Sequence, residues 1–433
     1  MNYKQCLEYL EHVQAQGIKF GLDNVRTLLS SVDNPHQKYP SILVAGSNGK
    51  GSVCAMLTRI LSLHHYKAGL YTSPHLIRTE ERIQVGKNPV PPESFCRLLS
   101  LLKEKIEQLI ERKKLSHPPT FFEHMTCLAF LYFQEQNVDM AVLEVGMGGR
   151  FDATNVVDPA LSVITTVSME HKEFLGESLS QIAFEKAGVL KPGVEVVCGV
   201  EKPEAYATIK KRAQEVKAPF YGVFENGKEC LVHRGSWGYS FEYRSDSHTY
   251  KFTPALHGEH QGKNASVAIL ASERLSPNWG LETEKIIQGI ETTEWEARLE
   301  VISRSPLILL DGAHNEEGAL ALREYIQNFV PPPLVLVFAV MKNKEIEKVA
   351  DILFPLTEKV ILTRFPFHKS ASPQQIKDRT LRYRDRLLLE PEVSQAVPKA
   401  VQLAGEGGSV IISGSLFLAG EVKKLFPRGN FHP

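Results

Sequence analysis

The segment that decides the fold lies near the amino end and reads Ser41-Ile42-Leu43-Val44-Ala45-Gly46-Ser47-Asn48-Gly49-Lys50-Gly51-Ser52. Its first five residues form a short apolar run that is typical of a buried parallel strand. After the glycines, apolar residues recur at positions 53, 56, 57, 60 and 61, which is the spacing of one face of a helix. The sequence therefore predicts a strand, a glycine-rich loop and a helix in succession.

The loop between that strand and helix has the composition of a phosphate-binding loop. Glycines let backbone N–H groups surround a phosphate, the amino end of the helix favours negative charge, and Lys50 adds a positive charge. Ser52 can offer its hydroxyl to a magnesium ion. The pattern departs from Gly-x4-Gly-Lys-Ser/Thr, because position 44 is Val and Gly51 separates Lys50 from Ser52. A glycine-rich turn that only caps the helix is the alternative interpretation.

Composition excludes several classes of function. The chain has 433 residues, of which 43% are hydrophobic, and its 50 Lys and Arg balance 50 Asp and Glu. This balance removes the field that draws proteins onto nucleic acids or anionic membranes. The longest apolar run, Leu334 to Met341, is far shorter than the roughly 20 residues that span a bilayer, and the amino terminus does not resemble a signal peptide. We expect a soluble, cytoplasmic protein without nucleic-acid or membrane partners.

Strand and helix patterns alternate along most of the chain. Further apolar runs predict strands at 68–72, 139–145, 161–167, 307–310, 334–339, 359–363 and 409–413. Residues 218–256 are rich in Tyr, Phe and Gly, and short alternating runs there predict a small antiparallel appendage. We expect an α/β protein: a doubly wound, mostly parallel sheet domain with the phosphate loop and this appendage, then a smaller Rossmann-like domain. The boundary divides the chain into residues 1–296 and 297–433.

Polar residues follow several of the predicted strands, at the edge where the carboxyl ends of parallel strands meet. Ser73, Glu144 and His171 are three of them. A carboxylate on a buried strand is costly unless it is paired or metal-bound, and beside a phosphate loop such an acid commonly holds magnesium. We predict that these three residues converge on one magnesium ion. The alternatives are a salt-bridged or helix-capping Glu144 and a structural His171.

Two further segments carry polar groups at positions that are usually apolar or that bind ligands. In the helix predicted between Ser178 and Gly188, Lys186 falls on the apolar face. The alternative to a functional role is a lysine that covers apolar surface with its stem and reaches solvent with its ammonium group. Asp311 and His314 follow another predicted strand and mark a second ligand edge, with a helix cap as the alternative.

Taken together, these segments resemble the folylpolyglutamate synthase and dihydrofolate synthase family of the Mur ligase superfamily. The phosphate loop is close to the family's Gly-Thr-Asn-Gly-Lys-Gly-Ser, with Ser47 in place of Thr. Other segments agree in the same order between about Gly21 and Val422, namely 71–76, 81–83, 120–123, 143–150, 152–155, 184–188, 260–265, 295–300, 311–315, 341–344 and 413–416.

The resemblance implies an ATP-dependent amide ligase of folate biosynthesis and one-carbon metabolism. Such a ligase joins L-glutamate to the carboxylate of dihydropteroate or of a folate through an acyl phosphate, and it releases ADP and phosphate. The resemblance further implies two magnesium ions, ATP as co-substrate, a possible monovalent cation, a carbamylated Lys186 and a monomer. Small molecules are the only partners it implies.

Site roles also follow from the resemblance, position by position. The nucleotide is expected at Gly46, Ser47, Asn48, Gly49, Lys50, Gly51, Ser52, Asn264, Arg298 and Asp311. Metal ligands are expected at Ser52, Ser73, Glu144 and His171, catalytic roles at Lys50, Lys186, Glu144 and His171, and substrate contacts at Phe122, Ala153 and His314. The chain departs from the family pattern at Glu170, Ala297, Glu316 and Lys369, where Asp, Gly, Pro and Arg are usual.

Two other functions stay open at this point. One is a Mur ligase that joins amino acids to a peptidoglycan precursor, although the phosphate loop begins too early in the chain to leave room for the nucleotide-sugar domain of those enzymes. The other is an ATP-binding regulatory module that carries out no ligation. The sequence also leaves open whether the acceptor is dihydropteroate, a reduced folate or both, and how long a glutamate tail becomes.

Overall fold

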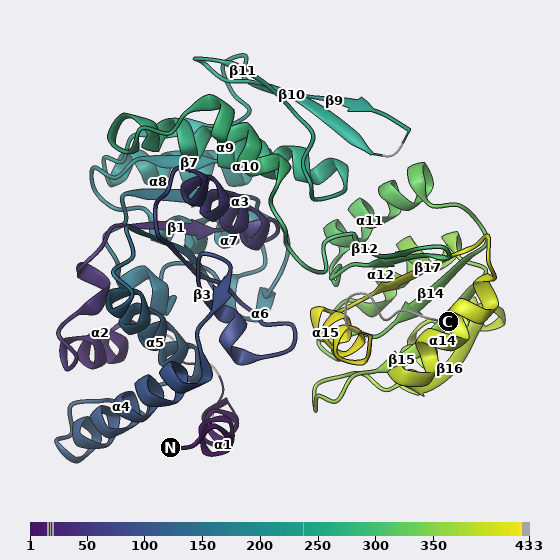
Figure 1. Ribbon diagram of the computed structural model, residues 1–433, viewed down its shortest axis with the longest axis horizontal. Helices are drawn as coiled ribbons and strands as arrows, with labels where there is room; N and C mark the ends of the chain where they lie inside the picture. The colour runs from purple at the N-terminus through teal and green to yellow at the C-terminus, as the bar shows by residue number, and fades with distance from the viewer. Residues whose placement is uncertain (15–16, 18, 20, 237, 427–433) are drawn as a thin grey trace.

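The computed structural model describes residues 1–14, 17, 19, 21–236 and 238–426, and Figure 1 shows two α/β domains side by side. The first is built on an eight-stranded sheet and the second on a six-stranded sheet, with a separate three-stranded sheet above the first. This confirms the predicted fold class. Within the described residues, no helix is long and apolar enough to cross a membrane.

The eight-stranded sheet is parallel except at one edge. Its strands, in spatial order, are β4 (Asn88–Pro89), β3 (Ile83–Val85), β2 (Ala68–Tyr71), β5 (Met140–Glu144), β1 (Ser41–Ala45), β6 (Leu161–Ile164), β7 (Val196–Cys198) and β8 (Phe220–Gly222). Only β3 and β4 run antiparallel to their neighbours. All five residues of β1 are buried, as its continuous apolar run predicts for a strand covered on both faces.

Helices cover both faces of this sheet. On one face lie α3 (Lys50–Leu63), α9 (Glu259–Trp279) and α10 (Thr283–Glu291), which share an apolar cluster with Ile42 and Val44 of β1. On the other face, around Leu43 and Ala45, lie α1 (Tyr3–Gln14), α2 (Asp23–Ser30), α4 (Pro92–Glu111), α5 (Phe121–Glu135), α7 (Leu179–Lys186) and α8 (Pro203–Glu215). The short helix α6 (Lys172–Leu175) precedes α7.

The predicted antiparallel appendage is present but shorter than expected. It consists of β9 (Glu229–Arg234), β10 (Tyr239–Arg244) and β11 (Thr249–Phe252), with β10 in the middle. The prediction was wrong for β8, which lies in the range assigned to the appendage but pairs in parallel with β7. The appendage also reaches the second domain (Figure 1), where the ring of Tyr239 packs edge-on against Phe329 at 4.9 Å.

The second sheet is parallel apart from its first strand. Its order is β12 (Glu300–Arg304), β13 (Leu307–Leu310), β17 (Ser409–Ser413), β14 (Leu334–Phe338), β15 (Lys359–Arg364) and β16 (Leu387–Glu392). The helices of this domain are α11 (Glu316–Phe329), α12 (Ile346–Leu353), α13 (Pro373–Arg379), α14 (Val393–Ala404) and α15 (Leu416–Leu425). Figure 1 shows α11 and α15 on the side of this domain that faces the first domain.

Candidate functional site

The phosphate loop joins β1 to α3 in the predicted way. Gly49 has φ +82°, and a Cβ atom there would lie 2.2 Å from Oδ1 of Asn264, so only glycine fits this turn. Helix α3 begins at Lys50, and the Lys50 Nζ folds back to donate to the carbonyls of Gly46 at 2.9 Å and Ser47 at 3.2 Å. The amino end of a helix that begins with a lysine is well suited to bind an anion.

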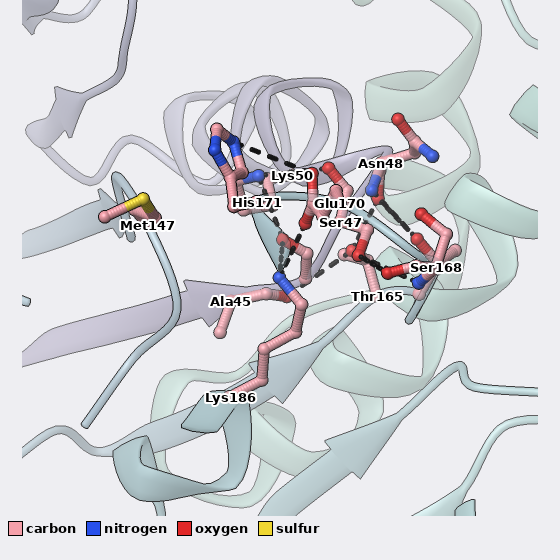
Figure 2. Close-up of polar contacts among 12 residues, drawn as sticks. Ala45, Ser47, Asn48, Lys50, Met147, Thr165, Ser168, Glu170, His171 and Lys186 are labelled. Atoms are coloured by element: carbon pink, nitrogen blue, oxygen red, sulfur yellow. Dashed lines mark hydrogen bonds and ion pairs between the residues drawn. The ribbon is translucent and has the colours of Figure 1, made fainter. Parts of the chain in front are cut away.

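The loop is held in place by residues that follow β6 (Figure 2). The backbone N–H of Asn48 donates to Oγ1 of Thr166 at 2.9 Å, and Oγ1 of Thr165 donates to the carbonyl of Asn48 at 2.6 Å. The N–H of Ser168 donates to Oγ of Ser47 at 2.9 Å. These bonds organise the loop. Strand β6 ends at residue 164 and not at 167: the N–H of Thr165 still donates to the carbonyl of Ala45 at the end of β1, whereas the carbonyl of Thr166 accepts from the N–H of Ser47 in the loop.

Glu144 lies at the carboxyl end of β5, as predicted, and is 5% exposed. Its Oε2 accepts a hydrogen bond from the N–H of Ser73 at 3.0 Å. Burial raises the pKa of Glu144, and the positive charges of Lys50 and Arg298 offset part of that effect. A cavity of about 610 Å³ opens beside this carboxylate between the two domains, and its lining includes Gly51, Ser73, Trp295, Arg298, Leu416 and Lys423.

Lys186 points into the base of the phosphate loop (Figure 2). Its Nζ donates to the carbonyl of Gly46 at 2.9 Å and to Oε1 of Glu170 at 2.9 Å, while the side chain is 1% exposed. Because the ammonium group does not reach solvent, the snorkelling alternative is wrong. Burial lowers the pKa of Lys186 to about 8. Burial acts to raise the pKa of Glu170, but the charges of Lys186 and Lys50 outweigh it and lower that pKa to about 2.

His171 follows β6 on the same edge of the sheet and lies beside Glu170. Its ring is 34% exposed, and its Nε2 lies 4.0 Å from Oε2 of Glu170. Burial lowers its pKa, so the ring is neutral at pH 7 and able to bind a metal ion. Among the described residues, no hydrogen bond or ion pair joins this ring to Glu144 or Ser73. The structure therefore brings Ser73 and Glu144 together, and it leaves His171 beside Glu170.

The second domain contributes a loop organised around Asp311. The carboxylate accepts N–H hydrogen bonds from Leu299 at 2.9 Å and from Ala313 at 2.9 Å. Burial raises the pKa of Asp311, and the charge of Arg298 opposes this. Arg298 donates to the carbonyl of Ala297, which has φ +55°. This left-handed backbone is the physical reason why glycine is usual at that position in the family.

The predicted substrate residues occupy three different surroundings. The ring of Phe122 packs at 5.8 Å from that of Tyr71, and Ala153 is 4% exposed. Neither belongs to the described lining of the 610 Å³ cavity. Nδ1 of His314 lies 3.0 Å from the carbonyl of Gly312, and burial lowers the pKa of His314 to about 3, so its ring is neutral.

One functional candidate, His260, was not singled out from the sequence. Its Nδ1 is buried and has no hydrogen-bond partner in the described part of the chain. Burial and then the charge of Arg298 lower its pKa to about 4. The neighbouring Gln261 reaches the phosphate-loop helix, with Nε2 at 3.5 Å from Oγ of Ser52. A signal existed, because His260 begins one of the segments that agree with the family, but only Asn264 of that segment was assigned.

Comparison with known proteins defines the class of protein. Residues 44–272 match the Mur ligase middle domain, and residues 297–416 match the Mur ligase glutamate ligase domain. The chain therefore belongs to the Mur ligases.

Individual relatives narrow this class. The chain is 32% identical to the dihydrofolate synthase/folylpolyglutamate synthase of Bacillus subtilis over 94% of its length and 95% of the relative. Its structure is similar to that of the Mycobacterium tuberculosis folylpolyglutamate synthase complexed with ADP and AMPPCP. The TM-score is 0.91 at 27% identity, and the match covers 99% of this chain and 100% of that one. For E. coli FolC with DHPP and ADP, the TM-score is 0.86 at 26% identity, with 98% and 97% of the two chains covered.

The chain is thus a member of the folylpolyglutamate synthase and dihydrofolate synthase family. It is an acid–amino-acid ligase that uses ATP to join glutamate to a folate carboxylate.

Proposed function

We propose that ligation takes place where the phosphate loop, Glu144 and the Arg298–Asp311 loop meet, with the domains dividing at 296/297. The observation that carries this proposal is the cavity of about 610 Å³, because it has Glu144 and Ser73 on one side and Arg298 on the other. The triphosphate lies along Gly46–Ser52, with Lys50 released from its own loop to the phosphates. The nucleoside lies toward Asn264, His260 and Asp311, where the unpartnered Nδ1 of His260 is available to it.

The residues at this site fit magnesium. Within the described chain, no three His, Cys, Asp or Glu side chains gather into a site that would hold a metal ion alone. Magnesium does not need one, because it takes few protein ligands and completes its shell with water and phosphate oxygens. Glu144 and the hydroxyls of Ser52 and Ser73 offer oxygen donors, and His171 is neutral. Bound magnesium would neutralise charge on the phosphates during transfer.

The chemistry follows from the weakness of a carboxylate as an acyl donor. The folate carboxylate attacks the γ-phosphorus, ADP leaves, and the resulting acyl phosphate is attacked by the amine of glutamate, which displaces inorganic phosphate. Lys50 and the helix amino end stabilise the charge on the transferred phosphoryl group. His314 of the second domain is proposed to contact the glutamate substrate.

Lys186 is proposed to be carbamylated in the working enzyme. A neutral amine adds to carbon dioxide and releases one proton, and the pKa of about 8 makes the neutral form accessible near physiological pH. The carbamate would lie beside Glu170, so two anions would replace the present ion pair. The positive charge of Lys50, and of magnesium when it is bound, would offset the repulsion between these two anions.

Both dihydropteroate and reduced folates are proposed as acceptors. Support comes from the Bacillus subtilis relative, whose name joins both synthase activities. Phe122 and Ala153 are proposed to contact the pterin. The test is ADP release by purified protein with each acceptor in turn; release that depends on both glutamate and the acceptor is expected. Glutamate-independent ATP hydrolysis would favour a regulatory module instead.

The enzyme is proposed to be a cytoplasmic monomer that needs only small-molecule partners. Its six cysteines are all free, which suits a reducing compartment. A monovalent cation near the phosphate loop is part of the same proposal.

We expect Arg298→Ala to raise the KM for ATP. A charge-assisted hydrogen bond to a phosphate contributes about 1.5–3 kcal/mol, which corresponds to a loss of roughly ten- to a hundredfold. Arg304→Ala is the matched control, since Arg304 is an exposed arginine at the end of β12. Calorimetric titration with ADP should give the same ranking. Equal affinity for ADP in both variants would remove Arg298 from the nucleotide site.

A further inference from the structure

The phosphate loop touches the second domain through the side chain of Asn48. Its Nδ2 donates to Oε2 of Glu317 at 2.9 Å, and its Oδ1 accepts from Nδ2 of Asn315 at 3.0 Å. Both partners lie at the amino end of α11, with Asn315 as the N-cap and Glu317 in the first turn. The backbone of Asn48 is meanwhile anchored to the threonines after β6. One residue of the loop therefore joins the two domains.

Glu317 also binds a third element. Its Oε1 accepts a hydrogen bond from Nζ of Lys202, which lies between β7 and α8 at the carboxyl edge of the eight-stranded sheet. The two oxygens of one carboxylate from the second domain thus hold two separate loops of the first domain. Of the two partners, Asn48 belongs to the phosphate loop and Lys202 does not. Because Glu317 is on α11 and bonds to Asn48, movement of α11 is coupled to movement of the loop.

We propose that Glu317 is a positioning residue for the ligase reaction. By holding Asn48 and Lys202, it places the second domain over the phosphate loop, so that Arg298 and Asp311 meet a nucleotide bound there. This inference rests on the proposed function, because it assumes ATP at the loop. Without Glu317, the arrangement in which the second domain lies over the phosphate loop is populated less often. The apparent affinity for ATP then falls by the same fraction. The rate of turnover falls as well where closure completes the site.

The contact suits positioning better than stabilisation. The side chains of Lys202 and Glu317 are 43% and 34% exposed, and exposed ion pairs add little to the free energy of unfolding. Apolar packing between the domains, such as that of Tyr239 on Phe329, persists without them. Loss of Glu317 should therefore be visible in kinetic constants and not in the melting temperature.

The neighbouring residue provides a matched control. Glu316 also lies in the first turn of α11, and it pairs with Lys348 at 3.4 Å. Lys348 is on α12 of the same domain, so this pair makes no contact across the domains. Glu316→Ala removes the same charge from the same helix end, and it leaves the bridge intact.

The test compares kcat and the KM for ATP in Glu317→Ala and Glu316→Ala. We expect kcat/KM for ATP to fall about tenfold in Glu317→Ala and less than about twofold in Glu316→Ala, with both melting temperatures near that of the parent protein. Lys202→Ala should show a similar loss, and the double variant Lys202→Ala/Glu317→Ala should lose no more than Glu317→Ala alone, because the residues act as one unit. Exchange of the charges, as Lys202→Glu with Glu317→Lys, should restore part of the rate.

Equal kinetics in Glu317→Ala and Glu316→Ala would overturn the inference, and so would strictly additive losses in the double variant. If Glu317→Ala lowers the melting temperature in proportion to its activity, Glu317 is structural and the inference also fails. Absence of glutamate-dependent ADP release by the parent protein would instead refute the proposed function, and the positioning role would fall with it.

Discussion

Glu144→Gln should abolish most turnover and leave the fold intact. The substitution keeps the size of the side chain, and the amide oxygen can still accept the N–H of Ser73. It removes a buried carboxylate at this edge that could neutralise a divalent cation. Loss of such a ligand costs several kcal/mol of transition-state stabilisation, so kcat should fall by about a hundredfold or more.

Although Glu144→Gln should lower turnover, it should not lower the stability of the fold. Burial raises the pKa of Glu144 above that of the unfolded chain, so the charged form is disfavoured in the folded state at pH 7. Removing that charge should leave the melting temperature unchanged or higher without ligands. Glu135→Gln, which affects a surface pair with Arg97, is the control for both measurements. Normal turnover of Glu144→Gln at moderate magnesium concentration would exclude the residue from metal binding.

Lys186→Ala should lose activity by about a hundredfold or more, because it removes the group that joins the phosphate loop to Glu170. If the carbamate is the working form, acetate or another short carboxylate should restore part of the activity. Lys186→Met serves as the control, since it retains most of the volume and leaves no space for acetate. Recovery in both variants would show that acetate acts elsewhere.

Carbamylation also predicts a pH dependence with a definite sign. Carbon dioxide reacts with the neutral amine, and a pKa of about 8 makes that form scarce at pH 6.5 and abundant at pH 9. After removal of carbon dioxide, bicarbonate should therefore restore activity more completely at the higher pH. Carbon-13 NMR with labelled bicarbonate should detect one carbamate signal in the parent protein and none in Lys186→Met. Full activity without carbon dioxide at every pH would contradict this role.

Four strands of the first sheet, β1, β2, β5 and β6, could be predicted because each is buried along its whole length, whereas β3, β4 and β7 were not predicted. A strand such as β1 is apolar throughout, and a glycine loop with a helix follows it, so local pattern and tertiary role agree. Edge strands gave weaker signals. The prediction did not include β12 and β16, which lie at the two edges of the second sheet and are half exposed, and β16 contains Pro391. Burial on one side leaves no continuous apolar run to detect.

Site residues could be predicted where they lie at or directly after the end of a predicted strand. They could not be predicted where the contact depends on how distant segments pack together. Glu144 and Ser73 lie together because β5 and β2 are adjacent. His171 lies seven residues beyond β6, in a segment with a left-handed turn, and no strand pattern determines where such a side chain points. The ion pair of Lys186 with Glu170 and the bond from Asn48 to Glu317 join residues far apart in the sequence. No local spacing encodes either contact.

The central claim is that a folate carboxylate is activated by phosphorylation before glutamate attacks it. The most direct measurement uses an acceptor whose carboxylate is labelled with oxygen-18, together with ATP, magnesium and glutamate, and analyses the inorganic phosphate by mass spectrometry. An acyl phosphate requires that one labelled oxygen pass from the acceptor to phosphate in every turnover. The account predicts one oxygen-18 in each phosphate released. Unlabelled phosphate accompanied by amide formation would contradict it.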